Sequence, residues 1–388
     1  MPEFCSRQDL DCEVPGPDIS SAAMNSAAVI GRSLTEVDTP SLLLDPDALQ
    51  ANISCLASYF TDRHCKLRPH FKSHKCTAIA KLQMQAGAVG ITCAKLGEAE
   101  VLADAGIRNI LIANQIVGPL KIVRLMELAK RAEPMVAVDC ADNVRMLSQF
   151  ASNAKVTIRV LVEVDIGLNR CGVQSGDPAL ELARLVSNSP GLEFKGLQGY
   201  EGHIVDLRDE NERTEKTRAA VSPLIETRRL IERSGLPVDI VTGGGTGTYT
   251  ITGNFPGMDE MQAGSYACMD WWYSDIRPEF RQAQTILATV ISRPSPQLAI
   301  VDVGRKGIGA EMGPPRVKDM ADATVSKFGS EEHAGVSFVE SNDIPVGARL
   351  QLIPSHGCTT CNLYREYVVH RDGVVMDVWP IEGAGKMQ

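Results

Sequence analysis

Residues 67 to 75 read Leu67-Arg68-Pro69-His70-Phe71-Lys72-Ser73-His74-Lys75, a short strand that ends in two histidines and two lysines. Crowding by other cations favours the uncharged form of a lysine amine. The uncharged amine is the form that attacks a carbonyl carbon to make an imine. We therefore take Lys72 as a candidate imine-forming residue. A solvated basic loop is the alternative interpretation.

The same pattern of a short apolar strand, a turn and an amphipathic helix repeats along the chain. Helical stretches such as 96–105, 120–132 and 211–234 carry apolar residues at intervals of three and four. Eight strands are predicted, at 67–72, 90–94, 109–113, 135–139, 160–165, 196–202, 239–243 and 260–266. Eight parallel strands joined by helices predict an α/β fold, a closed (β/α)8 barrel. An open doubly wound sheet is the alternative, because a count of strands does not establish closure.

The pattern changes after about residue 275. Segments such as 284–291, 348–353 and 374–379 alternate apolar and polar positions between glycines, prolines and aspartates. That alternation predicts a second, smaller antiparallel β domain. We therefore predict three parts, which are a loose extension at 1–38, a barrel at 46–275, and a β domain made of 39–45 plus 276–388.

Composition restricts the class of protein. The chain has 388 residues and a formal net charge of -9, which argues against nucleic acid as a general partner. No run of about twenty apolar residues is present, so we expect no membrane span. The acids and the proline at the N-terminus differ from the basic start of a secretory signal. Eleven cysteines, several in apolar runs such as 91–94, are expected to be reduced in the cytoplasm.

Polar residues gather where the later strands end, and a barrel carries its reacting groups at these ends. Candidates from the fifth and sixth strands are Asp165, Asn169, Arg170, Gln198, Tyr200, Glu201 and His203. The seventh and eighth strands end in two glycine-rich turns, Thr242-Gly243-Gly244-Gly245-Thr246-Gly247-Thr248 and Gln262-Ala263-Gly264-Ser265-Tyr266. Backbone N–H groups and hydroxyls in such turns hold phosphate. Phosphate beside an amine-bearing strand predicts pyridoxal 5'-phosphate (PLP) bound as an imine to Lys72.

A second group of candidates lies in the predicted β domain, in Pro354-Ser355-His356-Gly357-Cys358. Residues two apart in an extended segment project to the same side. His356 and Cys358 could therefore bind one divalent cation, such as zinc, manganese or cobalt. Two protein ligands leave positions for water or substrate, which suits a catalytic metal. A turn with a buried cysteine is the alternative, and Cys361 is assigned to packing.

Several of these stretches together resemble the D-threonine aldolase and D-serine dehydratase family of PLP enzymes. They are 68–75, Gly167-Leu168-Asn169-Arg170-Cys171-Gly172, 242–248, 262–266 and 356–358, and the similarity extends from about residue 39 to the C-terminus. The resemblance implies the alanine-racemase-like fold, which is fold type III of PLP enzymes. It also implies a homodimer with shared active sites, in which the β domain completes the partner's site.

The resemblance implies a role for each matching residue. Lys72 would bond to the cofactor aldehyde, and Arg170 would contact the phenolic oxygen. His356 and Cys358 would hold a divalent cation (Mn, Zn, Co or Mg) that coordinates the β-hydroxyl of the substrate. The residues expected to hold the phosphate are Gly244, Gly245, Thr246, Gly264, Ser265 and Tyr266, and the further candidates for cofactor binding are His70, Gln198, Tyr200 and Thr242.

Two reactions of β-hydroxy D-amino acids compete within the family. Retro-aldol cleavage gives glycine and an aldehyde, whereas dehydration of D-serine or D-3-hydroxyaspartate gives a keto acid and ammonia. The segments 114–119, 269–270 and 313–315 look like those of the aldolases, so we predict a carbon–carbon lyase, with a carbon–oxygen lyase as the alternative. Cys358, in contrast, is similar to the dehydratases.

An amino-acid racemase and a non-catalytic PLP carrier fit the sequence less well than a lyase. A racemase would have no use for the two metal ligands His356 and Cys358. PLP carriers lack a β domain, which this chain is predicted to have. The aldolases tend to have histidine directly after the tyrosine of the sixth strand, where this chain has Glu201. The general base is therefore predicted to be His74 or His203. The bulky stretch Trp271-Trp272-Tyr273 either reshapes the substrate pocket or only packs.

Overall fold

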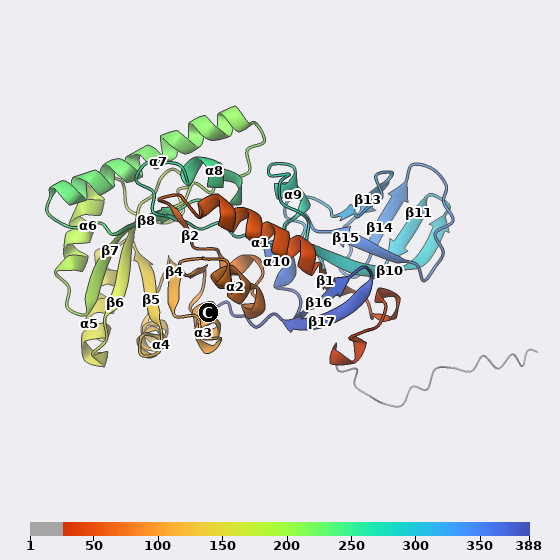
Figure 1. The fold of residues 1–388 in the computed structure, drawn as a ribbon, viewed down its shortest axis with the longest axis horizontal. Helices are drawn as coiled ribbons and strands as arrows, with labels where there is room; N and C mark the ends of the chain where they lie inside the picture. Colours follow the sequence, from red (N-terminus) through yellow and green to blue (C-terminus); the bar gives the residue numbers. More distant parts are fainter. Residues whose placement is uncertain (1–25) are drawn as a thin grey trace, which may run out of the picture.

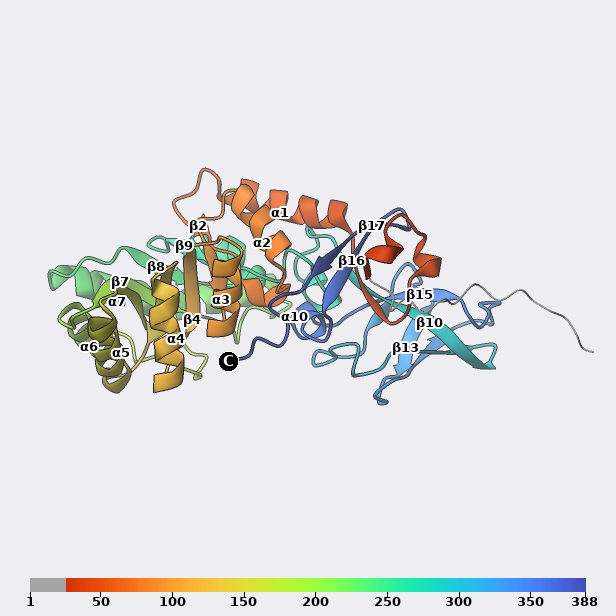
Figure 2. The same cartoon turned by 90° about the horizontal axis from the view of Figure 1, so that it is seen from below.

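The computed structural model describes residues 26–388 and contains two sheets that lie end to end along the molecule (Figure 1). One is a parallel sheet in the order β2-β9-β8-β7-β6-β5-β4-β3, here called the barrel. The other contains β1 and β10 to β17 and is here called the second sheet. Helix α1 (Pro46–Phe60) crosses from one to the other (Figures 1 and 2).

The barrel contains all eight predicted strands, in the predicted order. Their bounds are β2 (Lys66–Leu67), β3 (Ile91–Cys93), β4 (Asn109–Gln115), β5 (Glu133–Val138), β6 (Ile158–Glu163), β7 (Leu192–Gly199), β8 (Ile240–Gly243) and β9 (Glu260–Met261). The end strands β2 and β3 are joined by a parallel bridge between His70 and Thr92. Val89 and Thr92 also donate backbone N–H groups to Leu67 and Pro69, at 3.0 and 2.8 Å. These bonds close the ring, so the predicted α/β barrel is confirmed.

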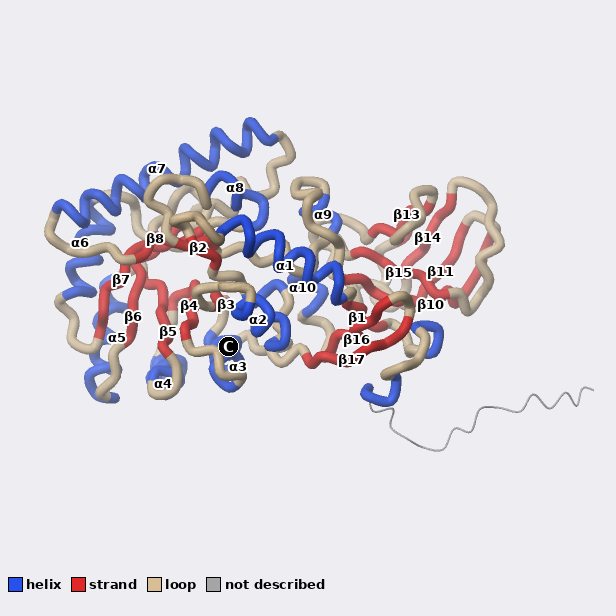
Figure 3. Tube along the Cα trace, in the orientation of Figure 1, coloured by secondary structure: helices blue, strands red, loops and turns tan. Residues whose placement is uncertain are grey.

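Helices follow the barrel strands and cover the outside of the ring (Figure 3). They are α2 (Thr77–Gln85), α3 (Leu96–Asp104), α4 (Pro119–Ala129), α5 (Ala141–Ala154), α6 (Asp177–Ser187), α7 (Glu210–Arg233) and α8 (Tyr249–Thr252). Each amphipathic helix buries one apolar stripe, as α4 does with Ile122, Leu125 and Leu128. Because every crossover returns to a parallel strand, the carboxyl ends of the strands all meet at the same rim.

The second sheet is largely antiparallel, as predicted. Its strands are β1 (Ser41–Leu44), β10 (Gln284–Ser295), β11 (Leu298–Val301), β12 (Arg316–Val317), β13 (Ala323–Lys327), β14 (Ala334–Phe338), β15 (Arg349–Ile353), β16 (Glu366–Arg371) and β17 (Val374–Pro380). Strand β11 pairs with both β14 and β10, which closes a smaller antiparallel barrel. The early strand β1 lies between β10 and β16, pairing antiparallel with the first and parallel with the second.

Residues 26–38 differ from the predicted loose extension. They form two short 3-10 helices, η1 (Ser26–Val29) and η2 (Leu34–Glu36), against strand β17. Gly31 and Leu34 donate backbone N–H groups to Val375 and Gly373, both at 2.8 Å, and Leu34 packs in an apolar cluster. Buried apolar side chains therefore order this segment. The rest of the predicted extension, residues 1–25, lies outside the described residues.

The segment after β17 returns to the barrel and ties the two sheets together. Glu382 accepts hydrogen bonds from the backbone N–H and the hydroxyl of Thr77, at 3.0 and 2.6 Å. Lys75 pairs with Glu98 at 2.7 Å and also donates to the carbonyl of Gly383. The end of the chain lies beside α3 (Figures 1 and 2). Within residues 26–388, no helix has both the length and the apolar character that crossing a membrane requires.

Candidate active site

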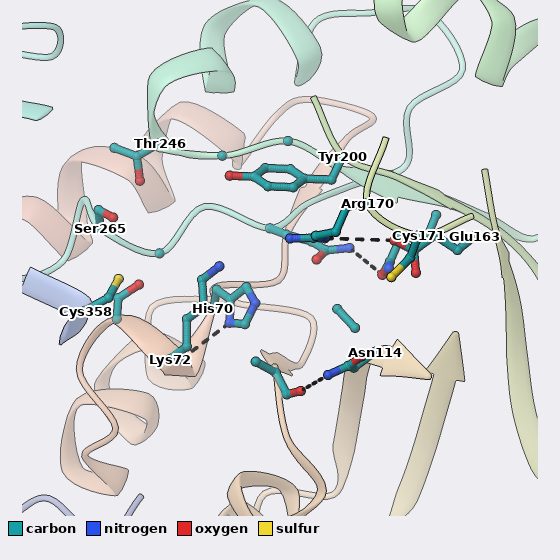
Figure 4. Close-up of a pocket in the computed structure, with 18 of the residues that line it drawn as sticks. His70, Lys72, Asn114, Glu163, Arg170, Cys171, Tyr200, Thr246, Ser265 and Cys358 are labelled. Carbon is teal, nitrogen blue, oxygen red and sulfur yellow. Dashed lines mark hydrogen bonds and ion pairs between the residues drawn. The ribbon is translucent and has the colours of Figure 1, made fainter. Parts of the chain in front are cut away.

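A cavity of about 290 Å³ lies at the carboxyl ends of the barrel strands, where the second sheet meets them. Most of the predicted site residues line it. They are His70, Lys72, Arg170, Gln198, Tyr200, Gly244, Gly245, Thr246, Gly264, Ser265, His356 and Cys358. The close-up shows Lys72 pointing upward between Cys358 on one side and Tyr200 and Arg170 on the other (Figure 4). Both sheets of the same chain therefore contribute to one site.

Lys72 lies in a 3-10 turn, η3 (Phe71–Ser73), and not in the strand that was predicted to include it. The strand ladder of β2 stops at Leu67, and the chain turns after His70. The Nδ1 atom of His70 accepts the backbone N–H of Lys72 at 3.4 Å, which caps the turn. Burial, and then the charge on Lys72, hold the pKa of His70 well below its ordinary value. A neutral imidazole therefore fixes the turn that directs Lys72 into the cavity.

The two glycine-rich turns form a cradle next to Lys72. A Cβ atom added at Gly264 would lie 2.2 Å from Ser73 Oγ, so only glycine allows this close approach. Ser73 Oγ is buried and has no nitrogen or oxygen partner, although the Cys358 sulfur lies beside it. Thr246 Oγ1 accepts the backbone N–H of Tyr266 at 3.1 Å, which joins the two turns. The buried Ser73 hydroxyl could donate to a phosphate oxygen, and the glycines allow the backbone N–H groups of the turns to approach the same phosphate closely. This arrangement fits the phosphate of PLP.

Tyr200 forms one wall of the same cavity. The guanidinium of Arg170 lies 5.5 Å from the centre of its ring, and Lys72 Nζ lies 6.0 Å from it. Burial raises the pKa of the Tyr200 hydroxyl above its ordinary value, so the ring stays uncharged. A flat aromatic surface with two cations beside it suits a planar anionic ligand such as the pyridoxal ring.

The cavity wall also contains a carboxylate that was not predicted from the sequence, Glu163 at the end of β6. Gln115 Nε2 donates to its Oε2 at 2.6 Å, and Arg170 lies 4.0 Å from its Oε1. Burial raises the pKa of Glu163, although the bonds from Gln115 and the charge of Arg170 oppose it. Glu163 is two residues before Asp165, and alternation along the strand was the signal that could have identified it. Asp165 instead accepts backbone N–H groups of its own loop.

Four of the residues predicted to bind the cofactor or to act as the base do not line the cavity. The Thr242 hydroxyl accepts from Gln262, and the Tyr266 hydroxyl accepts from Gln83, both at 3.0 Å. His203 is exposed, and its ring lies against Gly167. The fourth is His74.

His74 is fully buried behind the turn that carries Lys72. Its Nδ1 atom accepts the backbone N–H of Cys76, and its Nε2 atom lies 3.3 Å from Gln83 Oε1. Burial lowers the pKa of His74 to about 4. The structure thus does not support His74 as a base acting on a substrate, because both ring nitrogens are engaged away from the cavity. A role for His203 as the base stays a prediction.

Glu201 and most of the aromatic stretch 271–273 pack in the protein and do not line the cavity. The carboxylate of Glu201 is buried and accepts hydrogen bonds from the Thr248 and Thr252 hydroxyls, at 2.7 and 2.5 Å. In helix α9 (Trp271–Ser274), Tyr273 lines the cavity. Trp271 packs elsewhere, under the guanidinium of Arg316. Only part of this bulky stretch therefore shapes the pocket.

His356 and Cys358 lie together on the cavity wall, although the segment is not extended as predicted. Residues Gly357–Cys361 form the short helix α10, and His356 is its N-cap. Burial alone would lower the pKa of His356, but the Cys358 thiolate and Asp270 raise it to about 11. Burial alone would likewise raise the pKa of Cys358, but His356 and Lys72 lower it below its ordinary value.

The donor set of this pair is one imidazole nitrogen and one thiolate sulfur, which suits a divalent cation of intermediate softness. Within the described part of the chain, no three or more histidine, cysteine, aspartate or glutamate side chains gather as metal ligands. A cation held here would therefore take its remaining ligands from water or substrate.

Comparison with known proteins identifies the family. Residues 44–270 match the model of the alanine racemase N-terminal domain, and residues 283–370 match that of a serine dehydratase domain. The chain therefore belongs to the D-threonine aldolase and D-serine dehydratase family, which has the alanine-racemase-like fold. The family predicted from the sequence is confirmed.

Individual relatives agree over nearly the whole length. The chain is 41% identical to D-threonine aldolase of Arthrobacter sp., over 95% of this chain and 98% of that protein. It is 36% identical to 3-hydroxy-D-aspartate aldolase of Paracoccus denitrificans (strain Pd 1222), over 92% and 95%. The crystal structure of D-threonine aldolase from Filomicrobium marinum superposes with a TM-score of 0.90 at 39% identity, covering 92% of this chain and 98% of that one.

Proposed function

We propose that the protein is a PLP-dependent and divalent-metal-dependent lyase that cleaves β-hydroxy D-amino acids to glycine and an aldehyde. One observation supports this above all: a single cavity contains Lys72, the glycine cradle and the His356–Cys358 pair. The full-length similarity to two kinds of aldolase supports the carbon–carbon bond as the one that breaks.

PLP, when bound, supplies an electron sink that stabilises negative charge on the α-carbon of an amino acid. Lys72 would hold its aldehyde, and Arg170 its phenolic oxygen. Tyr200 would lie against the ring. The phosphate would be held by residues of the two turns and of η3, which are Gly244, Gly245, Thr246, Gly264, Ser265 and Ser73.

The remaining groups of the cavity would select and orient the substrate. His356 and Cys358 would hold a cation against the β-hydroxyl, which lowers the pKa of that hydroxyl. Tyr273, beside His356, would bound the space for the β-substituent. Glu163 would keep Arg170 in place through the 4.0 Å ion pair. These residues would orient the bond between the α- and β-carbons for cleavage. A base would take the hydroxyl proton, and the electron pair of the broken bond would stay on the α-carbon, where PLP stabilises it.

A product assay tests the proposal. Purified protein is incubated with D-threonine, D-serine and their L-forms, with manganese and separately with a chelator. We expect glycine and acetaldehyde from D-threonine, and no product with the chelator. A bound yellow chromophore without turnover would instead indicate a PLP carrier. Formation of L-allo-threonine from D-threonine, or of L-serine from D-serine, would indicate a racemase, because a racemase inverts only the α-carbon.

Dehydration is the second candidate because Cys358 supplies a thiolate to the metal pair. The chain is 26% identical to D-threo-3-hydroxyaspartate dehydratase of Delftia sp. over 84% of its length. In the same assay, a keto acid and ammonia from D-serine or D-3-hydroxyaspartate would favour this function over the aldolase.

A homodimer in the cytoplasm is also part of the proposal. Val117, Leu120 and Val123 expose apolar side chains around the start of α4, close in sequence to Asn114 and Gln115 of the cavity wall. A second copy covering this surface would bury them and would reach the mouth of the site. The nine cysteines between residues 26 and 388 are all free thiols, which fits a reducing compartment. Light scattering of the purified protein tests the dimer.

A further inference from the structure

Asp270 lies between the barrel and the second sheet, and the cavity does not include it. It follows the last barrel strand and is the N-cap of α9, with only 1% of its surface exposed. One oxygen, Oδ1, accepts the backbone N–H of Tyr273 at 2.9 Å, which is the capping bond. The second oxygen, Oδ2, is not needed for capping.

That second oxygen accepts two hydrogen bonds from the connection between β15 and α10. The Nδ1 atom of His356 lies 2.9 Å from Oδ2, and the backbone N–H of Gly357 lies 3.0 Å from it. A carboxylate can only accept, so the hydrogen of this bond belongs to Nδ1 of the imidazole. The second ring nitrogen, Nε2, is then the one left for a ligand, and the ring also contacts the thiol of Cys358.

We propose that Asp270 is a positioning residue that fixes the orientation and the tautomer of His356 for metal binding. This inference rests on the proposed function, because it takes His356 and Cys358 as the cation ligands. Partners of this kind hold metal-bound histidines in many proteins, and their loss typically weakens metal binding about 10- to 100-fold.

The contact of Asp270 with His356 and Gly357 also sets the distance between the cofactor cradle and the metal ligands. Asp270 is covalently continuous with the cradle through Gly264 and Ser265, whereas His356 follows β15 of the second sheet. The bonds from His356 and Gly357 therefore tie the metal ligands to the turn that would hold the phosphate. Asp270 would thus place the cation relative to the cofactor as well as orient its ligand.

The variant Asp270→Asn separates capping from positioning. Asparagine is as good an N-cap as aspartate, so its oxygen can still accept the Tyr273 N–H. Its NH2 group would then stand in place of Oδ2 and cannot accept from His356 or Gly357. We expect cobalt binding, measured by calorimetry, to weaken about 10- to 100-fold. We also expect an altered visible spectrum of the bound cobalt, while PLP absorbance stays at the wild-type level.

Asp275→Asn is the matched control, because Asp275 lies just after the same short helix. Its carboxylate pairs with Arg208 and Arg316 at 3.0 and 2.9 Å. We expect this variant to bind cobalt like the wild type. Wild-type cobalt affinity and spectrum in Asp270→Asn would overturn the inference.

A measurement on the unmodified protein keeps the inference testable even if Asp270→Asn does not fold. In zinc-loaded protein with 15N-labelled histidine, we expect His356 to carry its hydrogen on Nδ1 and the metal on Nε2. Metal on Nδ1 would overturn the role of Asp270 while leaving the proposed lyase intact. Failure of the wild type to bind any divalent cation would instead refute the metal part of the proposed function, and this inference with it.

Discussion

At the scale of single residues, the chemistry depends most on Lys72. Lys72→Ala removes the amine that would bond to PLP, so we expect the visible absorbance of the purified protein to be lost. We expect turnover to fall about a thousandfold or more, because the groups around a covalent anchor act as a unit. Lys216→Ala, on the exposed face of α7, is the control and should keep both colour and activity. An unchanged spectrum in Lys72→Ala would contradict the assignment.

His74 gives a prediction about stability and pH. Its pKa is about 4 in the folded protein, because of burial, against 6.5 for an ordinary histidine. Between these values the unfolded chain binds a proton that the folded protein does not, so stability falls as the pH drops from 7 to 4. This histidine should account for about 3 kcal/mol of that loss. In urea unfolding, His74→Asn should have a flatter pH dependence than the wild type, and an equal slope would refute the prediction.

At the scale of elements, the turn after β9 is a test of the cradle. Gly264→Ala would bring a Cβ to 2.2 Å from Ser73 Oγ and 3.0 Å from His70 Cβ. The turn must then move away from η3, so we expect PLP affinity, measured by fluorescence quenching, to fall about tenfold or more. Gly329→Ala is the control, because an added Cβ there meets no atom within 4 Å. Wild-type PLP affinity in Gly264→Ala would mean that the turn does not hold the cofactor.

The elements also show which features the sequence could reveal. Apolar runs such as 109–113 and 160–165 located the eight barrel strands, because a buried parallel strand needs a continuous apolar segment. Short turns were missed, since η3 depends on a cap from His70 and α10 has only five residues. Glu163 was missed because it lies within the predicted strand 160–165, whereas the candidates were taken from where the strands end. Its alternation with Asp165 was the one available signal.

At the scale of the whole molecule, the metal should matter for activity and little for stability. Only two side chains of the described residues would bind it, and structural metal sites generally use four. We therefore expect a chelator to abolish activity while the melting temperature changes by about 2 °C or less. Manganese should restore activity to the chelated protein. Unfolding on chelation would show that the cation supports the fold.

Because the site is built from both sheets, activity depends on the position of one sheet relative to the other. Lys72 comes from the barrel rim and His356 from the connection after β15, and contacts such as Thr77 with Glu382 keep them opposite each other. A slight hinge movement at this seam would part the reacting groups while every helix and strand survived. Gentle warming or dilute urea should therefore abolish activity well before the circular dichroism signal shows any loss of secondary structure.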